Sequence, residues 1–104
     1  MKPPGKPLFI PLHAGPYDSF ASGAKCFELR LHGPRWNVRT CYPGRAVILS
    51  RGYGKKYRMA GRVVSFAVVY ASALTPEMLG AFIACYGEGK RQAEIALIGI
   101  EADP

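Results

Sequence analysis

Cationic side chains are concentrated in about a third of this 104-residue chain, which carries a formal net charge of +7 at pH 7. Between residues 25 and 62 stand ten lysines and arginines but only one acidic residue, Glu28. The ten are Lys25, Arg30, Arg35, Arg39, Arg45, Arg51, Lys55, Lys56, Arg58 and Arg62. Guanidinium groups present paired donors to phosphate oxygens, and each neutralised phosphate releases counterions. The cluster favours a nucleic-acid backbone as partner; an acidic protein or a solvated basic face are the alternatives.

Aromatic residues are interleaved with these cations in two segments, a loop over residues 33–45 and a hairpin connection over residues 51–57. Such rings stack on unpaired bases. We therefore expect RNA or single-stranded nucleic acid to contact both segments. The contact residues expected there are Arg35, Trp36, Arg39, Arg51, Tyr53, Lys55, Lys56 and Tyr57.

The residues from Cys26 to Leu31 alternate strictly between two kinds of side chain. This period predicts a strand that turns Phe27 and the next two odd-numbered residues into the core, and turns Glu28 and Arg30 to the other face. Lys25 and Arg30 offer donors to a phosphate or a base edge, while Glu28 orients both or accepts from a base amino group. The alternative is a purely structural cluster, for which exposed pairs contribute about 0–1 kcal/mol.

The segment Gly23–Arg30 also fits the pattern G-x-K-x-x-E-x-R at each defined position. In this the chain resembles the ASCH domain family. The downstream Trp36, the Pro43-Gly44 turn and the apolar C-terminal strand are similar as well, so the resemblance extends over residues 9–101. It implies a PUA-like small β-barrel flanked by helices, with the signature lining a cleft that binds RNA or another nucleic acid.

The resemblance also implies an alternative function, because some ASCH proteins are ribonucleases or amidohydrolases that act on an acetylated cytidine. In a hydrolase of this kind, Lys25 and Glu28 would be the catalytic residues. The amidohydrolases carry threonines at the places of Cys26 and Glu28, and a further acid for which Glu77 or Glu88 would stand here. A hydrolase that uses the same cleft is therefore the second hypothesis.

No metal and no cofactor are predicted. The histidines and cysteines lack the paired spacing of a zinc site, and Gly52–Lys56 fits neither a P-loop nor a dinucleotide fingerprint. The three cysteines, an odd number without a CxxC pair, indicate a reducing, cytoplasmic location. The longest nearly apolar run, residues 63–74, is too short to cross a bilayer, so no membrane partner is expected.

The element order expected from the periodicities is β-α-β-β-β-α-β. The expected ranges are a strand over 8–12, a helix over about 16–23, strands over 26–31, 46–49 and 58–70, a helix over 75–86 and a strand over 94–101. Gly61 is expected to mark a bulge, and Cys85 and Tyr86 to pack in the core. Short connections exclude most parallel crossovers, so we predict an α+β fold: a small mixed β-barrel of about five strands with two flanking helices. Residues 1–7 form an extended arm and 8–104 one domain.

Overall fold

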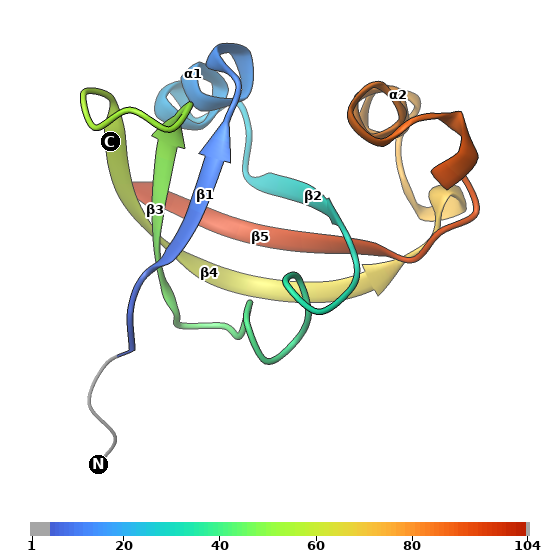
Figure 1. Ribbon diagram of the computed structural model, residues 1–104, viewed down its shortest axis with the longest axis horizontal. Helices are drawn as coiled ribbons and strands as arrows, with labels where there is room; N and C mark the ends of the chain where they lie inside the picture. The colour runs from blue at the N-terminus through green and yellow to red at the C-terminus, as the bar shows by residue number, and fades with distance from the viewer. Residues whose placement is uncertain (1–4, 104) are drawn as a thin grey trace.

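Two α-helices and five strands follow one another in the expected order in the computed structural model, which describes residues 5–103 (Figure 1). They are β1 (Leu8–Leu12), α1 (Ala14–Ser22), β2 (Phe27–Leu31), β3 (Ala46–Arg51), β4 (Arg58–Val69), α2 (Pro76–Tyr86) and β5 (Ile95–Asp103), with 3-10 turns η1 (Ala71–Ala73) and η2 (Glu88–Lys90). The expected α+β fold is confirmed. Residues 1–4 of the expected arm lie outside the described residues, and 5–7 lead irregularly into β1.

The five strands form one mixed sheet in the order β1-β3-β4-β5-β2. The β1–β3 pair is parallel, and the other three pairs are antiparallel. Figure 1 shows the long strands β4 and β5 curving so that the sheet curls into a half-barrel. The two edge strands are β1 and β2, which face each other across the open side of this half-barrel.

The main core fills the inside of the curl. Its members come from all four strands other than β2, together with Phe20 of α1 and with Trp36 and Cys41 of the loop after β2. The fully buried aliphatic side chains are Ile10, Val47, Leu49, Val63 and Ile98, with Ile95 buried outside this cluster. Phe82 of α2 is also buried outside it, and α2 lies against β2. The sheet is therefore covered on two faces in the region of β2.

This double coverage makes the sequence prediction for the faces of β2 wrong. Directly opposed residues of a sheet share a face, so Glu28 lies with Ile98 on the face of the main core. Glu28 is only 7% exposed, whereas Phe27 is 39% exposed at the start of the strand, opposite Gly99. The charged face of β2 points into the half-barrel, and the apolar face points toward the second, smaller core under α2.

The two helices begin and end through local chemistry. The Met78 N–H donates to Thr75 Oγ1 at 3.2 Å, Pro76 occupies the first turn, and Glu77 lies at the positive end of α2, as expected. Helix α1 ends at Gly23, whose φ of 82° is left-handed. This turn directs the chain from α1 into β2.

Gly61 serves close packing rather than the expected bulge. The register of β4 against β5 shifts between Val63 and Ser65 instead. A Cβ atom on Gly61 would lie 2.8 Å from the Glu101 carbonyl oxygen and 3.2 Å from Val47 Cγ2. The neighbouring strands therefore leave room for a hydrogen atom only.

Candidate functional site

A cleft of about 380 Å³ opens above the edge strand β2. The end of β1, the start of α1 and the β3–β4 hairpin border it on one side, and α2 borders it on the other, which Figure 1 shows as the two helices standing on opposite sides of β2. Four of the predicted site residues line it, namely Lys25, Glu28, Arg30 and Tyr53. Its volume lies within the range of small-molecule sites, at the lower end.

Glu28 is the centre of the charged cluster at the base of the cleft. Its two carboxylate oxygens bind different cations: Lys25 Nζ lies 3.2 Å from Oε1, and Arg30 Nε donates to Oε2 at 2.8 Å. The Glu28 side chain is 9% exposed, against 29% for Lys25 and 17% for Arg30. Two cations with one carboxylate leave the base of the cleft with one net positive charge.

Arg30 also connects the two edges of the sheet. Its Nη2 donates to the Pro11 carbonyl oxygen of β1 at 2.8 Å, and its guanidinium lies 4.7 Å from the ring centroid of Trp36. The third guanidinium nitrogen, Nη1, has no hydrogen-bond partner within residues 5–103. Arg30 therefore has a structural role and retains donors for a ligand.

Lys25 is placed by the turn that follows α1. Its backbone N–H donates to the Ser19 carbonyl oxygen at 3.1 Å, two residues after the left-handed Gly23. Its ammonium lies 5.5 Å from the ring centroid of Phe20. Glu28 is its ion-pair partner, and the ammonium makes no side-chain hydrogen bond within residues 5–103, so its N–H donors are available on the cleft side.

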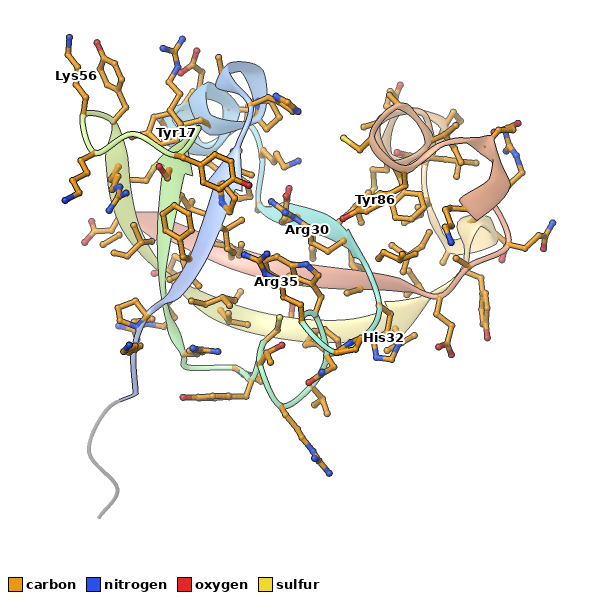
Figure 2. All side chains as sticks on the ribbon, in the orientation of Figure 1. Tyr17, Arg30, His32, Arg35, Lys56 and Tyr86 are labelled. Carbon is orange, nitrogen blue, oxygen red and sulfur yellow. The ribbon has the colours of Figure 1, made fainter. Side chains whose placement is uncertain are left out.

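The α2 wall of the cleft was missed in the sequence. Cys85 and Tyr86, expected in the core, both line the cleft, and Cys85 is exposed. Figure 2 shows Tyr86 extending from α2 toward Arg30. Phe82, whose ring lies 4.8 Å from that of Tyr86, is the residue that buries the helix against the sheet. Helical periodicity predicts the apolar side of α2, but it does not predict which residues of that side border a cavity. The exposed His13, at the start of α1, also lines the cleft.

The basic hairpin, residues 51–58 between β3 and β4, carries three of the predicted contact cations, Arg51, Lys55 and Lys56, and reaches the cleft through Gly52 and Tyr53. Lys55 and Lys56 are exposed, and Figure 2 shows Lys56 pointing outward from the tip. Arg51 lies 3.7 Å from Asp18 Oδ1 and 5.4 Å from the Tyr57 ring centroid. Tyr53, 79% exposed, lines the cleft from the same hairpin. The basic hairpin and the cleft therefore form one continuous surface.

The loop over residues 33–45 does not border the cleft. Trp36 is 7% exposed and belongs to the main core, with Arg30 on its ring and the Arg35 guanidinium 5.3 Å from its centroid. The loop closes the open side of the half-barrel with this indole, so the ring is not free to stack on a base. Arg35 and Arg39 are exposed on the loop itself.

Within residues 5–103, no group of three or more His, Cys, Asp or Glu side chains is placed to hold a metal ion. Neither helix of that part of the chain is long and apolar enough to cross a membrane.

No protein-family model matches the sequence, and no curated protein matches it. Among solved structures, the fold is similar to that of the hypothetical protein PH0355, with a TM-score of 0.70 and 16% sequence identity. The similarity covers 94% of this chain and 100% of that one. It concerns the fold alone, and supports the small curled-sheet architecture with its two helices.

Proposed function

We propose that the protein binds single-stranded nucleic acid, RNA in particular, with one nucleotide unit in the cleft and neighbouring phosphates on the basic hairpin. The observation that carries the proposal is the continuity of the two surfaces through Tyr53. The match of Gly23–Arg30 to the ASCH signature supports it independently, since that family is associated with nucleic acid.

Each part of this surface suits a different part of a nucleotide. The cations of the hairpin attract the backbone phosphates without regard to sequence. Tyr53 and Tyr86, from opposite walls of the cleft, offer aromatic surface to an unpaired base. Lys25 and Arg30 keep unused donors at the base of the cleft, next to the acceptor oxygens of Glu28.

The test is a fluorescence-anisotropy titration of the protein with single-stranded RNA, single-stranded DNA and a duplex at two salt concentrations. We expect single strands to bind more tightly than the duplex, with an affinity that falls steeply as salt rises. An affinity independent of salt, or none for any probe, would contradict the proposal. Each sample is then run on a denaturing gel, where cleaved RNA that stays intact with Lys25→Ala and Glu28→Ala would support a hydrolase instead.

Cys85 provides a direct test of the location. In a Cys26→Ser variant, Cys85 is the exposed thiol within residues 5–103, because Cys41 is buried. We expect bound oligonucleotide to slow alkylation of Cys85 by a maleimide in proportion to the fraction of protein bound. The matched control is Cys85→Ser, in which Cys26, outside the cleft lining, reacts at an unchanged rate. Equal protection of both thiols, or of neither, would place the ligand elsewhere.

Replacing Lys55 and Lys56 with alanine is expected to weaken binding to every single-stranded sequence alike. Loss of two phosphate contacts lowers the magnitude of the slope of log affinity against log salt by about 1.4–2. The control is Lys90→Ala with Arg91→Ala, which removes the same charge from exposed positions outside the hairpin and the cleft lining. An equal change in slope for both double variants would indicate attraction by net charge alone.

A further inference from the structure

One side of the β2 backbone faces the cleft. Two hydrogen bonds to β5 define which side: the Ile100 N–H donates to the Cys26 oxygen at 2.8 Å, and the His32 N–H donates to the Glu94 oxygen at 3.1 Å. In an antiparallel pair, hydrogen-bonded and non-hydrogen-bonded residues alternate, so the even-numbered residues of β2 bond β5. The N–H and C=O groups of Leu29 therefore point away from β5.

Leu29 is also the middle residue of β2, and it lines the cleft. Because β2 is an edge strand, no further strand of the described sheet pairs with these groups. The charged cluster and Tyr86 of α2, the helix that contacts β2, line the same cleft. The cleft therefore contains a fixed donor and a fixed acceptor next to aromatic surface.

We propose that the backbone N–H and C=O of Leu29 recognise the hydrogen-bonding edge of a nucleobase held in the cleft. The inference rests on the proposed function and names the part of the ligand that the cleft takes. Unpaired base edges present neighbouring donors and acceptors, to which a backbone donor and acceptor are complementary. Tyr53 and Tyr86 then contact the faces of the same base.

An extended peptide is the other kind of ligand that pairs with a free strand edge. The Arg30 side chain argues against it, because it crosses from β2 to the Pro11 carbonyl oxygen of β1 at 2.8 Å. A peptide strand running along β2 would have to displace this bond and the contact with Trp36. A single flat base at Leu29 leaves both in place.

The experiment compares two probes of equal length and charge: a single-stranded oligonucleotide of mixed sequence, and a phosphodiester made of abasic spacers. We expect the protein to bind the base-bearing probe about tenfold more tightly. Leu29→Pro removes the N–H while its fixed φ remains compatible with an edge strand, and it should reduce this preference to the part that stacking on Tyr53 and Tyr86 supplies, without weakening binding to the abasic probe. Leu29→Ala, which also shortens the side chain but keeps the N–H, should retain the preference.

The outcomes separate the inference from the proposed function. A preference undiminished in Leu29→Pro, or equal binding of both probes by the unaltered protein, overturns the inference and leaves phosphate binding intact. Binding to neither probe overturns both. Should Leu29→Pro fail to fold, the unaltered protein labelled with ¹⁵N-leucine decides: the Leu29 amide resonance should shift with the base-bearing probe only, and an equal shift with the abasic probe overturns the inference.

Discussion

Replacing Gly61 with alanine is expected to lower the free energy of unfolding by about 2–3 kcal/mol, the cost typical of overpacking a close-packed site. The added Cβ would lie 2.8 Å from the Glu101 carbonyl oxygen, a backbone atom that moves only if β5 moves. Such a shift would also disturb the pairing of β4 with β3, since Gly61 lies opposite Val47. Urea unfolding followed by circular dichroism measures the change.

Gly80→Ala is the matched control, because it adds the same methyl group but is expected to raise stability. Gly80 lies exposed in α2, and its added Cβ would meet no atom within 4 Å. Alanine loses less backbone entropy than glycine on forming a helix, so stability should rise by about 0.5–1 kcal/mol. A Gly61→Ala variant as stable as the Gly80→Ala variant would disprove the close approach of β4 and β5 at Gly61.

Glu28→Ala should be nearly as costly, with a loss of about 2–3 kcal/mol and a fall in Tm of about 10–20 °C. The change leaves Lys25 and Arg30, both largely shielded from water, without the carboxylate that pairs with them, and raises the net charge of the cluster from one to two. It also removes the bond that holds the Arg30 guanidinium in position for Pro11. Glu28→Gln, which keeps a hydrogen-bond acceptor but not the charge, should lose less.

The control for Glu28 is Glu94→Ala. Glu94 also pairs across the sheet, 3.2 Å from His32 Nδ1, but its side chain is 53% exposed. Loss of an exposed pair should change stability by at most about 0.5 kcal/mol. Thermal unfolding of the two variants side by side checks this difference. Indistinguishable Tm values for Glu28→Ala and the unaltered protein would show that the charged cluster contributes nothing to stability.

Elements whose signals are local could be predicted from the sequence. The start of α2 depends on Thr75, Pro76 and Glu77, three neighbours whose chemistry is complete without the rest of the fold. The end of α1 at Gly23 is of the same kind. The predicted placing of Glu28 and Arg30 on one face of β2 is also confirmed, because a strand of period two fixes it, whereas Lys25 joins them through the turn that follows α1.

Features that depend on what covers an element could not be predicted. The alternation in β2 correctly predicted which residues share a face. It did not predict what each face contacts, since the charged face points into the half-barrel and Phe27 remains half-exposed. For the same reason Trp36, expected to contact a ligand, lies in the core, and Tyr86, expected in the core, lines the cleft. The loop after β2 carries the indole into the core, and the packing of Phe82 turns the tyrosine toward the cleft.

The two edge strands of the half-barrel, β1 and β2, are connected by the hydrogen bond from Arg30 to Pro11 and not by backbone pairing. Along the rest of the sheet, separating two strands requires breaking a ladder of backbone hydrogen bonds, whereas β1 and β2 are joined there by a single side chain. Separating the two edges would break the Arg30–Pro11 bond and the contact of Arg30 with Trp36, but none of the backbone ladders of the sheet. Pro11 and Arg30 both line the cleft, so its two sides are held together at this point by a side-chain bond and not by a backbone ladder.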